Sequence, residues 1–129
     1  MAIELQMLAW AGVLGLAQVM LAAAAITRER GTQWNASARD GQAPPPWLLA
    51  GRLQRAQANF LETFAVFAAA AIAVVVAGRQ DSSTALAVQL YFWARLAYVP
   101  LYAAGIPYVR SLAWLVSLAG ILMLLWALL

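Results

Sequence analysis

The chain of 129 residues contains no cysteine and no histidine, and all eight of its basic residues are arginine. Without cysteine it can form no disulfide bond, no thiolate nucleophile of its own and no cysteine-ligated zinc site, and without histidine it lacks the usual haem ligand. We therefore expect no metal or haem cofactor, and any sulfur chemistry must come from a bound ligand. Arginine suits buried pairing with carboxylates, because its planar guanidinium donates two parallel hydrogen bonds.

Charged residues are scarce, at 10% of the chain, whereas hydrophobic residues make up 65%. Soluble globular domains carry about 25% charged residues. The composition therefore excludes a soluble domain and predicts an integral membrane protein. The sequence contains no dinucleotide or phosphate-loop signature, and we expect no nucleic-acid partner.

Four apolar segments reach the roughly 20 residues that a helix needs to cross the hydrocarbon core of a bilayer. They cover residues 3–26, 53–77, 84–104 and 111–129. The predicted fold is a single all-α domain over residues 1–129, an integral membrane four-helix bundle. The first segment is not expected to be a signal peptide, because it carries Glu4 and is preceded by no positively charged region.

The arginines outside the spans are distributed unevenly between the connections. The first and third connections hold Arg28, Arg30, Arg39, Arg52 and Arg110, whereas the second holds only Arg79. Because positively charged loops stay in the cytoplasm, we expect the long loop over residues 27–52 to be cytoplasmic and both termini to lie outside. The three prolines at 44–46 favour an extended surface connector in that loop.

Two predicted spans carry rows of polar residues. At about 100° per residue, the row on the second span lies within an arc of roughly 80°, and the row on the third within roughly 60°. The first row consists of Arg52, Arg55, Asn59 and Glu62, and the second of Tyr91, Arg95, Tyr98 and Tyr102. A charge at the bilayer centre costs about 2.5–3.5 kcal/mol, so ionisable groups there normally face a protein interior or a cavity and mark a site.

The two rows have two possible explanations. Glu62 could pair with Arg55 or Arg95 simply to lock the bundle together. The guanidinium groups near the cytoplasmic end outnumber this one intramembrane carboxylate, however, and an unpaired buried cation is costly. We therefore expect an anionic ligand to supply the missing negative charges.

Three stretches resemble one known family. The segment RLQRAQANFLE (52–62) is similar to the R-x-x-R-A-x-x-N-x-x-E signature of the membrane-associated proteins in eicosanoid and glutathione metabolism (MAPEG). ARLAYVPLY (94–102) and YVRSLAW (108–114) also resemble the family. The resemblance is to bacterial members of the microsomal glutathione transferase type. It implies a homotrimer in the bacterial inner membrane, with glutathione bound between adjacent subunits near the cytosolic side.

The resemblance also implies roles for individual residues. Those expected to contact glutathione are Arg55, Gln57, Asn59, Glu62, Tyr98 and Tyr102. Arg110 is expected to promote formation of the glutathione thiolate. Either Arg28 or Arg30 would reach the site of the neighbouring subunit, and Arg52 and Arg95 join the candidates because of the charge excess.

The chain departs from the family pattern at two positions. Ala65 stands where many members have a proline, so the usual distortion of the second helix is in doubt, and Thr63 replaces a tyrosine of the leukotriene-forming members. In the fourth span, Trp114 and Trp126 are interpreted mainly as packing and lipid-contact residues.

The predicted function is a glutathione transferase or peroxidase that acts on lipophilic substrates arriving from the membrane lipids. A non-catalytic scaffold or subunit that binds a lipophilic ligand is the alternative. A small multidrug-type transporter is a further alternative, although the arginines beside Glu62 would hold that carboxylate ionised and repel cationic drugs.

Overall fold

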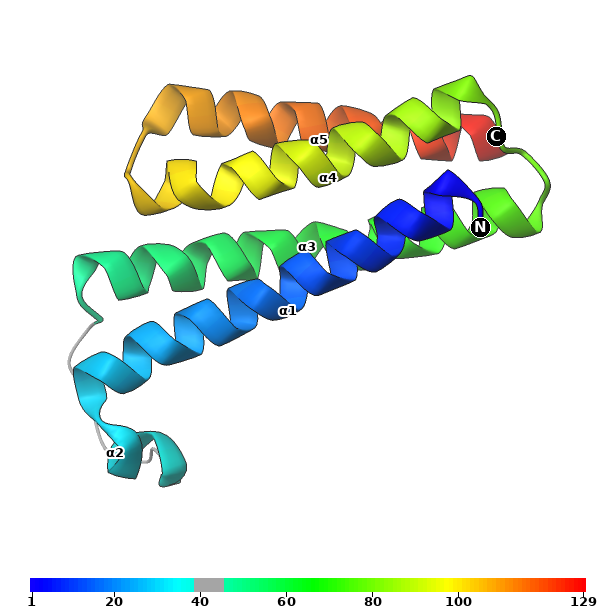
Figure 1. Cartoon of the computed structure of the whole chain (residues 1–129). Helices are drawn as coiled ribbons and strands as arrows, with labels where there is room; N and C mark the ends of the chain where they lie inside the picture. The colour runs from blue at the N-terminus through cyan, green and yellow to red at the C-terminus, as the bar shows by residue number, and fades with distance from the viewer. Residues whose placement is uncertain (39–45) are drawn as a thin grey trace.

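The computed structural model describes residues 1–38 and 46–129, in which every regular element is a helix and none is a strand (Figure 1). The all-α prediction is therefore confirmed for these residues. The helices are α1 (Ile3–Arg30), α2 (Thr32–Ala36), α3 (Leu48–Val76), α4 (Ser82–Ala103) and α5 (Pro107–Leu128). The four long helices α1, α3, α4 and α5 pack side by side, and α2 is a single short turn of helix after α1.

The starts of α4 and α5 follow from local sequence. Asp81 caps α4, because its side chain accepts a hydrogen bond from the Thr84 backbone N–H while the Thr84 hydroxyl accepts one from the Asp81 N–H. Pro107 opens α5, where its fixed φ fits the first turn and its missing N–H costs nothing. Gly105, at φ +75°, makes the tight turn between α4 and α5. Such short connections hold successive helices antiparallel.

Three helices of the described residues, α1, α3 and α5, are long and apolar enough to cross a membrane. This supports the prediction of an integral membrane protein. Although α4 has 22 residues, it does not belong to this group. Its polar side chains reduce its hydropathy, and three of them, Tyr91, Arg95 and Tyr98, are buried against the other helices. The four-span prediction is thus supported for three of its four segments.

Close helix packing depends on two glycines. A Cβ atom on Gly120 of α5 would lie 2.6 Å from the Ala87 carbonyl oxygen of α4. A Cβ on Gly15 of α1 would lie 2.8 Å from the Phe60 ring of α3. Small residues let helix backbones approach in membrane proteins, where association depends on packing rather than on exclusion of water. Gly120 and Gly15 therefore set the α4–α5 and α1–α3 separations.

The helices next to the long connection extend beyond the predicted spans. α1 continues to Arg30 and α3 begins at Leu48, so much of the segment 27–52 is helical rather than loop. Polar residues are tolerated there because a helix can run past the hydrocarbon core into the interface. The Trp47 N–H donates to both carboxylate oxygens of Glu29 at 2.9 Å, which ties the two ends of the connection together. Arg39 and the prolines at 44 and 45 lie outside the described residues.

Both chain termini lie at one end of the bundle, opposite the α1–α3 connection (Figure 1). We call the opposite end, where α1 and α4 finish and α3 and α5 begin, the loop end. This topology places the first turns of α3 beside the last turns of α4 and the first turn of α5. The polar residues of three separate helices therefore meet at the loop end.

Candidate functional site

The polar rows of α3 and α4 face each other. One guanidinium nitrogen of Arg95 (Nη1) donates to the Asn59 side-chain oxygen at 2.8 Å. The Arg95 guanidinium carbon also lies 4.4 Å from the centre of the Tyr98 ring and 5.5 Å from that of Phe60. Arg95 is 1% exposed, so this charge is held inside the bundle by one hydrogen bond and two aromatic faces.

The hydrogen bonding of Arg95 is incomplete. Its Nε and Nη2 atoms are buried and find no hydrogen-bond partner in the part of the chain that the structure describes. A guanidinium has five N–H donors in a fixed fork. Arg95 therefore fixes the orientation of the Asn59 amide and still has donors to offer a water molecule or a ligand.

Tyr102 lies between two arginines from different helices. The Arg55 Nε on α3 donates to the Tyr102 hydroxyl at 3.2 Å. The Arg110 guanidinium on α5 lies over the same ring, 4.7 Å from its centre. The Tyr98 ring meets the Tyr102 ring edge to face, with centres 5.6 Å apart. Tyr102 thus brings together two arginines of different helices, Arg55 of α3 and Arg110 of α5, at the loop end.

A polar cavity of about 160 Å³ opens beside Arg110 and Tyr98. It is lined by Asn59, Tyr98, Arg110, Ser111 and Trp114. The lining combines a cation, an amide and two hydroxyl groups, which together can bind an anionic group or another group that accepts hydrogen bonds. Complete ligand pockets measure roughly 300–1,000 Å³. This cavity can therefore enclose only part of a molecule of ordinary ligand size.

Arg52 is engaged by the backbone. It donates to the Ala103 carbonyl oxygen at 3.2 Å, and its guanidinium packs where a Cβ on Gly105 would approach within 2.7 Å. The last carbonyls of a helix lack intrahelical partners, and a cation there also complements the helix dipole. Arg52 thus fastens the start of α3 to the end of α4.

The remaining predicted residues do not line the polar cavity. Gln57 is half-buried on α3, and Glu62 is exposed one turn beyond Asn59. Arg28 contributes to a separate, mainly apolar pocket of about 340 Å³ between the end of α1 and the start of α3. Arg30 lies over the Trp34 ring, 4.7 Å from its centre.

Cations exceed anions at the site. Among the described residues, none of Arg52, Arg55, Arg95 and Arg110 forms an ion pair with a carboxylate. Arg55 bonds to Tyr102 and Arg95 to Asn59, so among the described residues Glu62 does not form the pair with Arg55 or Arg95 that was one of the two explanations for the polar rows. The described part of the chain contains no group of three or more acidic side chains that could hold a metal ion.

Sequence reasoning missed the part that Trp114 takes in this cavity. We predicted a packing and lipid-contact role for it, but the structure puts it in the cavity wall with Ser111. The spacing could have shown this, because residues 110, 111 and 114 share one face of a helix.

Thr63 shares a hydrogen bond of 3.2 Å with the Tyr91 hydroxyl, and so links α3 to α4 one turn deeper than Asn59.

The sequence model of the MAPEG family matches residues 7–129, nearly the whole chain. No curated protein matches the chain.

Proposed function

Because the chain belongs to the MAPEG family, we propose that it is a membrane-embedded glutathione transferase or peroxidase. Its substrates would be lipophilic electrophiles or hydroperoxides that enter from the bilayer. The contacts of both Arg55 and Arg110 with Tyr102, next to a polar cavity and without a carboxylate partner in the described residues, carry this proposal.

Glutathione has the charges that this site lacks. Its two carboxylates suit the forks of the arginines, and its ammonium suits the exposed carboxylate of Glu62. Asn59 and Tyr98 offer neutral hydrogen-bonding groups in the cavity wall. Arg95 acts mainly on Asn59, which it holds in place from inside the bundle.

Arg110 would lower the pKa of the glutathione thiol. A nearby cation favours the thiolate over the thiol, and the thiolate is the reactive species. Arg110 would act electrostatically, since guanidinium stays protonated. In the transferase reaction the sulfur forms a bond to carbon, and the leaving group departs with its electron pair. In the peroxidase reaction the thiolate sulfur bonds to the terminal oxygen of the hydroperoxide and the O–O bond breaks. The alkoxide that leaves takes up the proton lost by the thiol and becomes an alcohol. The resulting sulfenic acid reacts with a second glutathione to give the disulfide and water.

A homotrimer would complete the site. The polar cavity is smaller than a full ligand pocket, and Glu62, Arg28 and Arg30 lie outside it in a single chain. A neighbouring subunit that supplies Arg28 or Arg30 would enclose the rest of the tripeptide, and Gln57 would contact it at the same boundary. In this assembly α4 crosses the membrane with its polar face turned inward.

The loop end would face the cytoplasm of a bacterial inner membrane. Arg28, Arg30, Arg52 and Arg110 all lie there, whereas Arg79 is the arginine of the α3–α4 connection at the other end. By the positive-inside rule, both termini would then be external.

The test combines binding, thiolate formation and turnover. Purified protein should bind glutathione, show the ultraviolet absorbance of a thiolate near neutral pH, and conjugate glutathione to 1-chloro-2,4-dinitrobenzene. Arg110→Met should reduce both the thiolate signal and turnover at least about tenfold, the equivalent of one pKa unit. Arg79→Met, which removes an exposed arginine at the opposite end, is the matched control and should change neither.

The outcomes separate the alternatives. Failure to bind glutathione would overturn the proposal. Binding without a thiolate signal or turnover would point to the non-catalytic scaffold. Full turnover in Arg110→Met would remove Arg110 from the mechanism.

A further inference from the structure

The Arg110 guanidinium is held by an aromatic ring and not by hydrogen bonds. In the part of the chain that the structure describes, it forms no hydrogen bond and no ion pair, and it lies over the Tyr102 ring, 4.7 Å from its centre. The negative face of an aromatic ring attracts a cation without occupying its N–H groups. All five N–H donors of Arg110 are therefore free to bind a ligand.

Arg55 is held by the same tyrosine in a different way. Its Nε donates to the Tyr102 hydroxyl at 3.2 Å, and its guanidinium carbon lies 5.8 Å from the centre of the ring. The hydrogen bond uses one N–H group and leaves both terminal nitrogens available to the two oxygens of a carboxylate. Tyr102 therefore contacts Arg110 through its ring and Arg55 mainly through its hydroxyl.

The Tyr102 ring is itself held from inside the bundle. The Tyr98 ring meets it edge to face, with centres 5.6 Å apart and planes at 63°. Edge-to-face contact is one of the preferred arrangements of aromatic pairs. Tyr98 is 2% exposed, and the Arg95 guanidinium carbon lies 4.4 Å from the centre of its ring. The position of Tyr102 thus depends on buried side chains and is set before any ligand binds.

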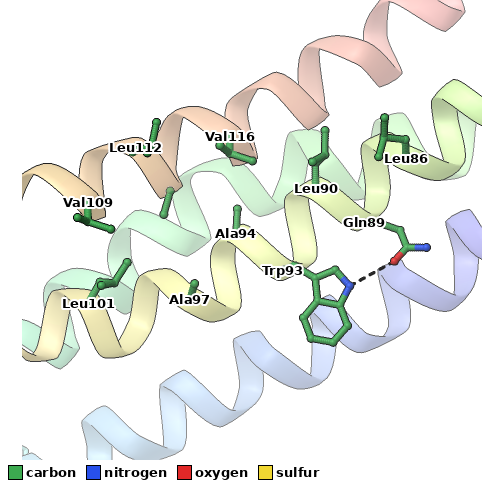
Figure 2. Close-up of a pocket in the computed structure, with 11 residues that line it drawn as sticks. Leu86, Gln89, Leu90, Trp93, Ala94, Ala97, Leu101, Val109, Leu112 and Val116 are labelled. Carbon is green, nitrogen blue, oxygen red and sulfur yellow. Dashed lines mark hydrogen bonds between the residues drawn. The ribbon is translucent and has the colours of Figure 1, made fainter.

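The α4–α5 pair has an apolar side and a polar side. On the apolar side is a groove whose loop end is lined by Leu101 of α4 and Val109 of α5, among others (Figure 2). Each of these residues immediately precedes a residue of the site, but neither Tyr102 nor Arg110 lines the groove. The contact between Tyr102 and Arg110 therefore forms on the side of the pair that faces α3, where Arg55 joins it.

Tyr102 does not line the polar cavity. The lining includes Arg110 and Tyr98, whereas Tyr102 is half-buried next to both of them. In a single chain, an effect of Tyr102 on a ligand in the cavity must therefore pass through the side chains that it holds.

We propose that Tyr102 is a positioning residue for the reaction described above. Its ring holds Arg110 beside the polar cavity, and its hydroxyl holds Arg55 for a carboxylate of the ligand. This inference rests on the proposed function and divides two roles between two parts of one side chain. Removal of the ring should impair thiolate formation, and removal of the hydroxyl alone should weaken binding.

Tyr102→Leu tests the ring. Without the ring Arg110 is no longer held near the thiol, so the pKa of the bound glutathione thiol should rise by about one unit. The thiolate absorbance measured against pH gives this pKa. Tyr102→Phe keeps an aromatic face and should keep the pKa found in the unaltered protein. Tyr102→Met, whose flexible side chain fills irregular space, replaces Tyr102→Leu if that variant does not fold.

A double variant shows whether the ring acts through Arg110. Tyr102→Leu combined with Arg110→Met should give the same thiol pKa as Arg110→Met alone, because the ring has no effect once the cation is gone.

Tyr102→Phe tests the hydroxyl. Loss of its hydrogen bond frees the Arg55 side chain, so the dissociation constant for glutathione should increase roughly threefold to tenfold. Isothermal titration calorimetry of the full-length protein in detergent measures this constant. In an Arg55→Met background the same change should have no further effect, because the hydroxyl acts only through Arg55.

Tyr108 provides the matched control. It is a second tyrosine close to Arg110 in sequence, but it is 87% exposed. Tyr108→Leu should leave the thiol pKa unchanged, and Tyr108→Phe should leave the dissociation constant unchanged.

The outcomes separate this inference from the proposed function. If the unaltered protein binds glutathione as a thiolate but Tyr102→Leu leaves the thiol pKa unchanged, the role of the ring is overturned and the proposed function stands. If Tyr102→Phe weakens binding equally with and without Arg55, the hydroxyl contacts glutathione directly and its positioning role is overturned. Failure of the unaltered protein to bind glutathione would overturn both proposals.

Discussion

The position of Arg95 shows how one residue can hold a charge inside a membrane bundle. Taking an ion out of water is costly unless hydrogen bonds and other partners replace the lost solvation. Arg95 receives these from the Asn59 oxygen and from the faces of Tyr98 and Phe60. Its effect on a ligand would therefore pass mainly through Asn59, whereas Arg55 and Arg110 lie closer to the surface of the site.

Asn59→Leu should destabilise the protein by roughly 1.5–3 kcal/mol, because it removes the one hydrogen bond of a buried cation. The measurement is resistance to unfolding in mixed micelles with increasing sodium dodecyl sulfate. The double variant Asn59→Leu with Arg95→Met should recover much of that loss, since replacing both partners with apolar groups is often nearly neutral. A double variant whose stability loss equals the sum of the two single losses would show that the pair is not coupled.

At the scale of the helix, the distance between neighbouring helix backbones determines where the site residues lie. α4 carries Arg95, Tyr98 and Tyr102, and α5 carries Arg110, so the α4–α5 distance determines whether Arg110 reaches the Tyr102 ring. Gly120 sets that distance, because its lack of a side chain allows contact with the Ala87 carbonyl. At the loop end, the hydrogen bond from Arg52 to the end of α4 and the turn at Gly105 hold α4 and α5 in place.

Gly120→Ala should separate α4 from α5 and lower stability by roughly 1–3 kcal/mol, the usual cost of overpacking a close contact. A backbone carbonyl cannot swing aside as a flexible side chain can, so the strain must move a helix. The thermal unfolding midpoint in detergent should fall. Gly12→Ala on α1 is the matched control, because a Cβ there meets nothing within 4 Å and its midpoint should not fall. Equal midpoints for both variants would show that the α4–α5 contact tolerates a methyl group.

At the scale of the whole molecule, the site of one chain is open on one side. The polar cavity is small, Glu62 is exposed and Arg28 lies in a different pocket. In a cyclic trimer each interface is heterologous, so it joins two different surfaces of identical chains. In the proposed trimer, each site would combine the Arg110 surface of one subunit with the end of α1 of the next.

Mixed assembly tests this division of the site. A variant with Arg28→Ala and Arg30→Ala, and a second variant with Arg110→Ala, should each be inactive when assembled alone. Trimers formed from equal amounts of both should regain about one quarter of the activity, since each shared site then draws both intact parts at random. Conjugation of glutathione to 1-chloro-2,4-dinitrobenzene is the measurement, after co-expression with two different tags. No recovery in verified mixed trimers would mean that a single subunit supplies the whole site.

The sequence by itself determined that this is an all-helical membrane protein of the MAPEG family and that two of its helices carry rows of polar residues. These properties depend on composition and helical periodicity, which are local. Only the tertiary structure decided that Arg110 and Arg55 meet on Tyr102, that Arg95 turns to Asn59, and that Trp114 lines the cavity. Such contacts join residues up to 47 positions apart, and they depend on helix separation and rotation. Those quantities are set by close approaches such as Gly120 against Ala87, which no periodic pattern encodes.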